Sequence, residues 1–348
     1  MLEQAKNGVI WTRKQGEGAS GAKASLWRAC KCSMIWHLRR GSLHLSRMVS
    51  PSGLRNHRSL TQLGSGHGLR DLATATLKEG LQWTDSNKIV GLESRVAILR
   101  NLGRSLLAHS EIFGDDGRPG HLVGEWVSTY IATTLTIFLD YMIANSPTPD
   151  TLDVLLLWDI LQKVLIPIWP KDRTVVDGSA IGDAWPLNTL RKNAKSGGDA
   201  GEIQPFHKLT QWLTYSLLTP FEQVLKKRWT NVKSLTVLPE YRNGGLLVDL
   251  GVLSLKQAAL DRGLKASNQS LPRFAASDDV IVEWRALTIA LLDVLHPLIV
   301  ERMETGVDLT MVRVLEAGTW RSGREVAAER RPKTKSSPIL IESDGTVF

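Results

Sequence analysis

The residues most able to do chemistry stand in one short run, LPEYRNGGLLVDLGVL, at positions 238–253. Glu240, Tyr241, Arg242 and Asn243 follow each other there, between an apolar Leu-Pro and an apolar segment that looks like a strand. A carboxylate between segments that should be buried must be paired, hydrogen-bonded or shifted in pKa, and Arg242 is the obvious partner. Asn243 and the two glycines after it also predict a turn with positive φ, so a plain turn is the alternative to a functional site.

Three further polar clusters stand on segments that are otherwise apolar: His207/Gln211/Tyr215, Glu283/Arg285, and Glu316/Trp320/Arg324. The spacings i, i+4 and i+8 place the members of the first and third clusters on one helical face. Each cluster has a structural alternative. The histidine could be satisfied or face solvent, the second cluster could be an ion pair at a helix start, and the third could be a surface stripe.

These residue types favour cleavage of a glycosidic or N-glycosidic bond. The transition state of that reaction resembles an oxocarbenium ion, so it needs one carboxylate near the sugar carbon and one proton donor on the leaving group. Glu240 is our first candidate for the carboxylate. Asp249 is a weaker candidate for a second one, since it could simply cap the segment that follows.

The sequence predicts neither a metal site nor a cofactor. The eight histidines are scattered, and the two cysteines, Cys30 and Cys32, lack partner ligands at zinc spacing. No glycine-rich phosphate loop follows a strand. The low cysteine content suits a reducing compartment, so we expect a cytoplasmic protein. No window of 18 consecutive apolar residues occurs, which predicts no membrane span.

The positive charge of the chain lies in its N-terminal part. The net charge is +8, but residues 1–70 carry twelve Lys or Arg and only two Glu. The remainder is slightly acidic and has no basic stripe with interleaved aromatic residues, which argues against nucleic-acid binding. Residues 1–70 are rich in Arg, Ser and Gly, as in a transit peptide. They lack a long amphipathic Arg face, so we expect a disordered or mis-assigned segment, followed by one helical domain over 71–348.

The hydrophobic periodicity predicts a mostly α protein with a few short strands, because no strand–helix–strand alternation and no internal repeat occurs. Residues 254–276 have the turn-rich composition of a loop, and the terminal PILIESDGTVF looks partly strand-like. The expected helices cover 72–82, 94–113, 125–143, 152–165, 205–228, 277–303, with a kink or break near Pro297, and 310–330.

From about residue 72 to the end, the chain resembles the uracil catabolism protein 4 family of fungi and bacteria. The stretches that carry the resemblance are GLESRVAILRNLG, LIPIWP, GDAWP, PFHKLTQWLTYSLLTP, LPEYRNGGLLVDLGVL, VEWRALTIALLD, LEAGTWRSGRE and SDGTVF. The resemblance implies a role in a route that converts uracil to a nucleotide, opens its ring and releases urea.

Within that route, the resemblance implies hydrolysis of a phosphorylated ribosyl substrate, ribosylurea 5′-phosphate, to urea and ribose phosphate. Glu240 would be the nucleophile or general base. Arg242, Arg285 and Lys208 would hold the phosphate or orient Glu240. His207, Gln211 and Tyr215 would contact the ureido group or the sugar hydroxyls. The other candidates would contact the substrate or support its binding: Tyr241, Asn243 and Glu283.

A more distant similarity joins FHKLTQ, EYR and VEWRA to the queuosine nucleotide N-glycosylase family, which implies a helical architecture like that of DNA glycosylases. Glu240 matches the catalytic acid of that family but replaces an aspartate. Members of the uracil catabolism family have a longer N-terminal region, which residues 1–70 do not resemble. Two alternatives to an enzyme therefore stay open. The chain could be a non-catalytic partner of the ring-opening enzyme, associated with other enzymes of the route, or it could be an inactive truncated paralogue.

Overall fold

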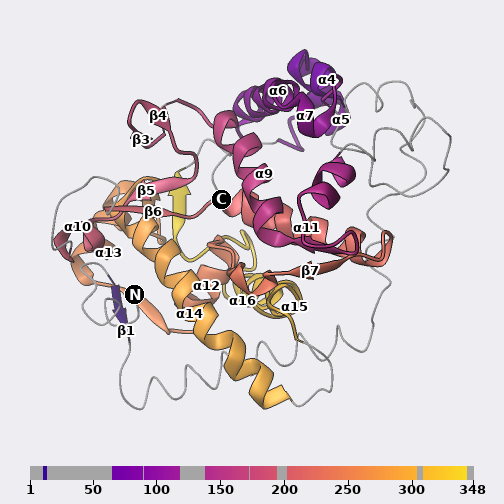
Figure 1. Cartoon of the computed structure of the whole chain (residues 1–348). Coiled ribbons are helices and arrows are strands. Elements are labelled where there is room, and N and C mark those ends of the chain that lie inside the picture. Colours follow the sequence, from indigo (N-terminus) through magenta and orange to yellow (C-terminus); the bar gives the residue numbers. More distant parts are fainter. Residues whose placement is uncertain are drawn as a thin grey trace.

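A computed structural model describes residues 11–13, 65–88, 90–117, 138–171, 173–193, 202–303 and 309–342. These residues form a mostly α-helical protein with short strands, as predicted (Figure 1). Most of the segment 1–70, and most of the helix expected over 125–143, lie outside the described residues. Among the described residues, no helix combines the length and the apolar character that a membrane span requires.

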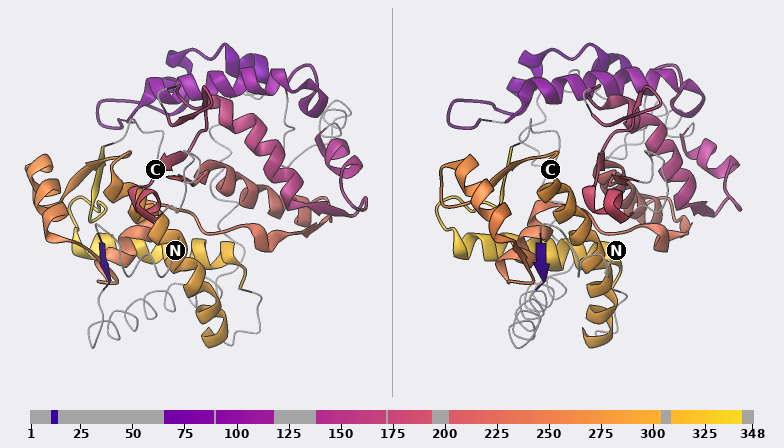
Figure 2. Two further views of the ribbon diagram at one scale, coloured as in Figure 1. Left: turned by 60° about the vertical axis from the view of Figure 1, so that its left-hand side comes forward. Right: turned by 90° about the vertical axis from the view of Figure 1, so that its left-hand side faces the viewer.

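The first helices form a layer along one side of the molecule, at the top of Figures 1 and 2. They are α4 (Gly66–Arg70), α5 (Thr74–Gly80), α6 (Leu92–Ala108) and α7 (Ser110–Phe113). The helix α6 follows the predicted apolar face, with Val96 and Leu106 almost fully buried. The helix α4 crosses α6 so closely that a Cβ on Gly103 would lie 2.3 Å from the backbone nitrogen of Arg70.

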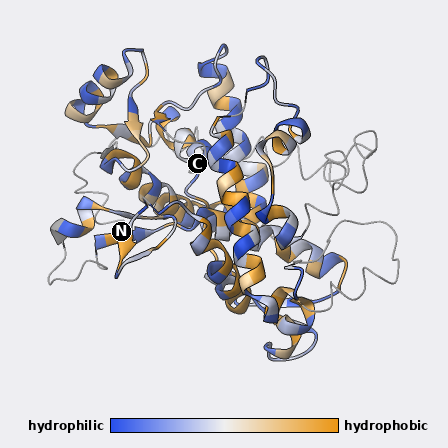
Figure 3. Ribbon diagram, turned by 90° about the horizontal axis from the view of Figure 1, so that it is seen from above, coloured by the Kyte–Doolittle hydropathy of each residue, from blue (hydrophilic) through white to orange (hydrophobic). Residues whose placement is uncertain are grey.

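The central helix is α14 (Asp279–Met303), which crosses the molecule diagonally and projects at its C-terminal end (Figures 1 and 2). One set of its side chains, including Val282 and Ile289, joins the core formed with α9 (Val154–Leu165) and α11 (Lys208–Gln223). Another set, including Ile281 and Trp284, joins a second core with α12 (Tyr241–Asp249) and α16 (Arg321–Arg330). A helix that is apolar on all sides is typically buried, and the first half of α14 is. Most other helices show one hydrophobic and one hydrophilic face (Figure 3).

The turn expected at Asn243 and the glycines after it is wrong, because these residues lie inside α12. Glu240 caps this helix, and the glycines allow close packing instead of a positive φ. A Cβ on Gly244 would lie 2.7 Å from Oγ1 of Thr288, and one on Gly245 would lie 3.1 Å from Cδ of Pro338. Glycine in a helix costs about 1 kcal/mol relative to alanine, and the close approach of neighbouring elements offsets this cost.

The expectation of a loop over 254–276 is wrong, because this segment contains α13 (Gln257–Ser267). Of the two alternatives expected near Pro297, a kink or a break, the break is absent, since α14 continues through this proline. The expected last helix is present as α15 (Met311–Arg313), the π-helical segment η6 (Val314–Trp320) and α16. Along it, Glu316, Trp320 and Arg324 are exposed, with the Arg324 guanidinium 4.7 Å from the Trp320 ring centroid, as in the surface-stripe alternative.

The strands are short and pair only two by two among the described residues. Parallel pairs are β2–β7 and β9–β10, and antiparallel pairs are β1–β8, β3–β4 and β5–β6. The strands are β1 (Trp11–Arg13), β2 (Thr151–Asp153), β3 (Val175–Val176), β4 (Ser179–Ala180), β5 (Ala184–Pro186), β6 (Ile203–Pro205), β7 (Arg228–Thr230), β8 (Leu253–Leu255), β9 (Arg273–Ala275) and β10 (Leu340–Glu342). The remaining short helical elements are η3 (Ile166–Ile168), α10 (Asn188–Asn193) and η5 (Val232–Ser234).

Candidate functional site

The centre of the candidate site is a buried ion pair between Asp183 and Arg285. Both Nη atoms of Arg285 donate to the Asp183 carboxylate, at 2.8 and 2.7 Å. The Arg285 side chain is only 1% exposed, and the Asp183 side chain is 4% exposed. Trp185 Nε1 donates to Oδ1 at 2.8 Å, and the backbone N–H of Lys208 donates to Oδ2 at 3.1 Å. The Arg285 guanidinium also stacks 4.0 Å from the centroid of the Phe206 ring. Each carboxylate oxygen thus accepts two hydrogen bonds.

This environment keeps Asp183 ionised. Burial alone would raise the pKa of Asp183. The charge and the hydrogen bonds of Arg285, together with the hydrogen bonds from the Trp185 side chain and the Lys208 backbone, instead hold this pKa well below its usual range. A carboxylate that is this acidic and already fully hydrogen-bonded is a poor general base. Asp183 therefore fixes its neighbours and does not accept protons near neutral pH.

Asp183 also determines how α11 begins. Its backbone carbonyl accepts the N–H groups of Phe206 and His207, at 2.9 and 3.0 Å. His207 adopts a left-handed conformation, with φ of 44°, immediately before the first helical residue Lys208. Such a conformation costs of order 1–3 kcal/mol in a residue other than glycine and persists only where surrounding contacts enforce it. The contacts with Asp183 supply that restraint.

His207 and Lys208 both become less basic in this setting. Burial lowers the pKa of His207, and the charge of Arg285 adds to this effect while Asp183 opposes it. Burial, helped by the positive charge of Arg285, lowers the pKa of Lys208 to about 8, against the opposing charges of Glu240 and Asp183. Lys208 is therefore a half-buried ammonium group that lies within the electrostatic influence of two carboxylates and one guanidinium.

Glu240 lies at the start of α12, within electrostatic range of Lys208. Its Oε2 accepts the backbone N–H groups of Arg242 and Asn243, at 2.7 and 3.2 Å, which is the usual geometry of a helix N-cap. Burial raises the pKa of Glu240, while the charge of Lys208, the two N–H groups and the charge of Arg242 act in the opposite direction. The structure therefore places His207 and Lys208 against Asp183, an aspartate that the sequence did not single out, and Glu240 within electrostatic range of Lys208.

Several other predicted site residues support the backbone. Gln211 Nε2 and the Tyr215 hydroxyl both donate to the carbonyl of Thr236, at 2.7 and 3.0 Å, on the segment that leads to Glu240. Burial raises the pKa of Tyr215. Thr236 Oγ1 in turn donates to Asp293 at 2.6 Å. These contacts fix the segment that leads to α12. The Gln211 and Tyr215 side chains, which the sequence predicted to bind substrate, thus bind a backbone carbonyl of the protein.

Asn243 and Glu283 are likewise engaged within the protein. Asn243 is 1% exposed, donates to the Leu238 carbonyl at 3.3 Å and accepts from Thr319 Oγ1 at 3.0 Å. Glu283 is buried on α14, two residues before Arg285, and accepts from Thr189 Oγ1 at 3.2 Å. Both side chains thus hold neighbouring elements at the edge of the cluster.

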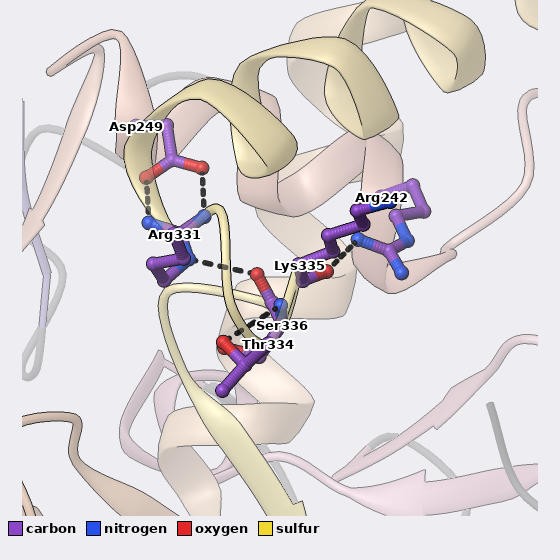
Figure 4. Close-up of polar contacts among 6 residues, drawn as sticks. All are labelled: Arg242, Asp249, Arg331, Thr334, Lys335 and Ser336. Carbon is purple, nitrogen blue, oxygen red and sulfur yellow. Dashed lines mark hydrogen bonds and ion pairs between the residues drawn. The ribbon is translucent and has the colours of Figure 1, made fainter.

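Arg242 and Tyr241, at the start of α12, are both half-buried. The Arg242 guanidinium is 4.8 Å from the Tyr241 ring centroid, and its Nη1 donates to the carbonyl of Lys335 at 2.8 Å (Figure 4). Arg242 forms no ion pair with Glu240 in the described contacts, where the sequence suggested one. Arg242 instead binds the backbone of the C-terminal segment, residues 331–342, which follows α16.

Asp249 lies at the opposite end of α12 from Glu240. The nine residues of the helix separate them by about 13 Å along the axis, at 1.5 Å per residue. Asp249 forms a bidentate ion pair with Arg331, at 2.8 and 2.5 Å, and Arg331 Nε also binds the Ser336 carbonyl at 2.8 Å (Figure 4). An open depression of about 480 Å³ adjoins this pair and is lined by residues of α12, β8 and the C-terminal segment, without Glu240 or Lys208.

The GDAWP stretch contains the signal that could have identified Asp183. Gly182 has φ of +74°, and a Cβ there would lie 2.9 Å from the Trp169 ring, so only glycine fits. An acid placed between such a glycine and Ala-Trp-Pro indicates a carboxylate that is held rigidly. Its partner Arg285 is 102 residues away and could not be assigned from spacing. Among the described residues, no group of three or more His, Cys, Asp or Glu could hold a metal ion.

The fold and the cluster define a mostly helical protein in which the start of α11 is anchored to a buried ion pair between Asp183 and Arg285 of α14, and a glutamate at the start of α12 lies within electrostatic range of Lys208. The chain belongs to the family described as "Protein of unknown function (DUF1688)", whose sequence model matches residues 50–348.

Two curated proteins are similar over most of this chain. "Uracil catabolism protein 4" of Lachancea kluyveri is 42% identical over 291 residues, which cover 82% of this chain and 63% of that protein. "Protein urg3" of Schizosaccharomyces pombe is 44% identical over 288 residues, which cover 81% of this chain and 60% of that protein. The chain thus spans about three fifths of the length of the curated relatives that it matches.

Proposed function

We propose that this chain acts in uracil catabolism as a metal-independent hydrolase of an N-ribosidic bond, with ribosylurea 5′-phosphate as substrate and urea and ribose phosphate as products. The printed name of the Lachancea kluyveri relative supports the pathway. The observation that carries the reaction type is a buried glutamate, Glu240, which caps α12 and whose pKa burial raises, within electrostatic range of Lys208, whose pKa burial lowers. Groups whose pKa values are shifted toward neutrality by burial are typical of acid–base sites.

Glu240 is the reacting carboxylate in this proposal. Cleavage of the bond between the sugar carbon and nitrogen develops positive charge on the sugar, and a nearby carboxylate stabilises that charge or accepts a proton from the attacking water. Asp183 is saturated by donors, and Asp249 is bound to Arg331 at the other end of α12. Glu240 is therefore the one carboxylate of the three in a position to act on a substrate beside Lys208.

The Asp183–Arg285 pair has a supporting role. Arg285 is 1% exposed and uses both Nη atoms on Asp183, so it does not reach out to a substrate phosphate. The pair instead holds the backbone at His207 and Lys208 through the hydrogen bonds of Asp183. Rigid support of this kind reduces the reorganisation that a reaction requires.

The pH dependence of turnover follows from the two shifted groups. Glu240 has to be ionised, so activity should rise as the pH increases through its raised pKa. Lys208 contributes as an ammonium group, so activity should fall as the pH increases through about 8. A bell-shaped profile of kcat/KM is therefore expected.

The test uses purified protein with ribosylurea 5′-phosphate and follows urea release. Glu240→Gln keeps an oxygen that can cap α12 but removes the charge, so the fold should be retained while kcat falls about 10²–10⁴-fold. Glu222→Gln is the matched control, since Glu222 is exposed on α11. Urea release by the Glu240→Gln protein at the unchanged rate would remove Glu240 from the mechanism.

The absence of urea from a folded wild-type chain would contradict the proposal as it stands. The same assay on the longer Lachancea kluyveri relative then separates two explanations. Urea release by the relative alone would show that the reaction needs sequence beyond the matched region. No release by either protein would favour a non-catalytic partner of the ring-opening enzyme.

A further inference from the structure

The Glu240 carboxylate is fixed through one of its two oxygens. Oε2 accepts the backbone N–H groups of Arg242 and Asn243, whereas no hydrogen bond within the described part of the chain reaches Oε1. A carboxylate that acts on a substrate has to be held to within about 0.5 Å while one of its oxygens stays available. The orientation of Glu240 therefore depends on what holds Arg242 and Asn243 in place.

Asn243 holds Glu240 at two points. Its backbone N–H donates to Glu240 Oε2 at 3.2 Å. Its side-chain Nδ2 donates at 3.3 Å to the Leu238 carbonyl, which also accepts the backbone N–H of Glu240 at 2.8 Å. Nδ2 can reach Leu238 only in one of the two orientations of the amide, so a donor beside Oδ1 is needed to select that orientation.

Thr319 supplies this donor. Its Oγ1 donates to Asn243 Oδ1 at 3.0 Å, and both residues are only 1% exposed, so water has no access to replace the bond. A threonine inside a helix often donates to the carbonyl four residues earlier, as Thr214 does on α11 at 2.8 Å. Thr319 instead spends its hydroxyl on a side chain of a different helix.

The element that carries Thr319 is itself unusual. It is the π-helical segment η6, which packs against α12. Segments of π-helix are rare and are frequently found at functional sites. Shortly after η6, Gly323 lets the backbone of α16 come so close that a Cβ would lie 2.2 Å from the Arg242 carbonyl oxygen. These two contacts brace the first turn of α12, where both N–H groups that bind Glu240 lie.

We infer that Thr319 is a positioning residue for Glu240, an inference that rests on the function proposed above. Through the Asn243 amide, it holds the first turn of α12 so that Oε2 stays bound and Oε1 is presented to water or substrate. The Thr319 hydroxyl takes no part in the reaction itself. A threonine that only stabilised the fold would instead contribute to the free energy of unfolding and leave the turnover of folded protein unchanged.

The experiment removes the hydroxyl in two ways and keeps it in a third. Thr319→Val preserves the volume, Thr319→Ala suits a helix better, and Thr319→Ser retains the donor. Thr214→Val is the matched control, because Thr214 is also fully buried and loses a hydrogen bond of similar length within its own helix. Circular dichroism and thermal melting verify that each variant folds, and urea release from ribosylurea 5′-phosphate gives kcat and KM.

Thr319→Val and Thr319→Ala should lower kcat about 10–100-fold and leave KM nearly unchanged, because a small displacement of the reacting group slows the reaction while the binding contacts persist. Thr319→Ser should retain most of the wild-type kcat. Thr214→Val should melt at a lower temperature than the wild-type protein, as Thr319→Val does, but should keep the wild-type kcat.

The pH dependence provides a measurement that a merely structural role would not change. The Asn243 N–H lowers the pKa of Glu240, so weakening of that bond should raise this pKa further. The acid limb of kcat/KM should therefore move to higher pH in Thr319→Val and stay in place in the control. The carboxyl ¹³C shift of Glu240, assigned with Glu240→Gln, follows the same titration without substrate. The charged groups that act on Glu240, Lys208 and Arg242, are present in both threonine variants.

An unchanged kcat in folded Thr319→Val and Thr319→Ala, or an equal loss of kcat in Thr214→Val, would overturn the inference and leave Thr319 as a packing residue. Failure of both Thr319 variants to fold, with Thr214→Val folded, would do the same. If the wild-type protein releases no urea, the proposed function fails, and the ¹³C titration decides the inference by itself. A Glu240 pKa that is higher in Thr319→Val than in the wild-type protein would support the positioning role, and an unchanged pKa would refute it.

Discussion

Replacement of Asp183 by asparagine should destabilise the protein strongly, although the two side chains have nearly the same shape. Arg285 would keep its charge at 1% exposure without a compensating carboxylate. The amide nitrogen of asparagine would also face a donor, because both carboxylate oxygens now accept N–H groups. Removal of one partner from a buried ion pair costs about 3–5 kcal/mol. At about 2–4 °C per kcal/mol for a large domain, the melting temperature should fall by roughly 10 °C.

The assay is thermal and urea unfolding of the wild-type and Asp183→Asn proteins across pH. The folded pKa of Asp183 is lowered, so its contribution is fully present above the unfolded value of 3.8 and is lost as the pH falls below it. The difference between the proteins should thus be constant from pH 5 to 7 and shrink below about pH 4. Asp183→Asn combined with Arg285→Met removes both charges and should recover much of the loss.

The surface pair Arg321–Glu325 provides the control for this experiment. Its atoms approach to 2.7 Å, but the side chains are 32% and 54% exposed. Glu325→Gln should therefore cost about 0.5 kcal/mol or less. The reasoning would be refuted if Asp183→Asn cost no more than Glu325→Gln, or if the double variant were no more stable than Asp183→Asn alone.

Three further predictions concern other parts of the molecule. Gly323→Ala should lower the free energy of unfolding by about 1–3 kcal/mol, because the added Cβ would lie 2.2 Å from a backbone oxygen of α12. Gly80→Ala, whose Cβ would have nothing within 4 Å, should leave this free energy unchanged or raise it by up to about 1 kcal/mol. Equal urea midpoints for these two variants would contradict this packing argument. Arg331→Met should lower the free energy of unfolding by about 3 kcal/mol in thermal melts, because Asp249 would be buried without its bidentate partner; an unchanged melting temperature would count against it. Between pH 8 and 10.5, the wild-type protein should gain about 3 kcal/mol relative to Lys208→Met, since the lowered pKa of Lys208 makes the unfolded chain bind more protons in this range. If the free energies of unfolding of the two proteins changed with pH in the same way, the pKa of Lys208 would not be lowered by folding.

The sequence by itself determined the helices whose apolar residues recur at helical spacing. Because this pattern is local, it placed α6, α9, α11 and α14 within a few residues of their bounds. It failed at the glycines of α12, where composition favours a turn but close contact with α14 favours a helix. It also identified Glu240, Lys208, His207 and Arg285 as candidates from their chemical types.

The tertiary structure alone decided which charges meet. Asp183 pairs with Arg285 across 102 residues, and Asp249 pairs with Arg331 across 82. Such partners are set by the packing of helices against each other, which leaves no periodic trace in the chain. Burial, which shifts the pKa of Glu240 upward and that of Lys208 downward, is likewise a property of the packed molecule. The sequence therefore supplied the charged groups, and the fold determined which of them form ion pairs and which of them are buried.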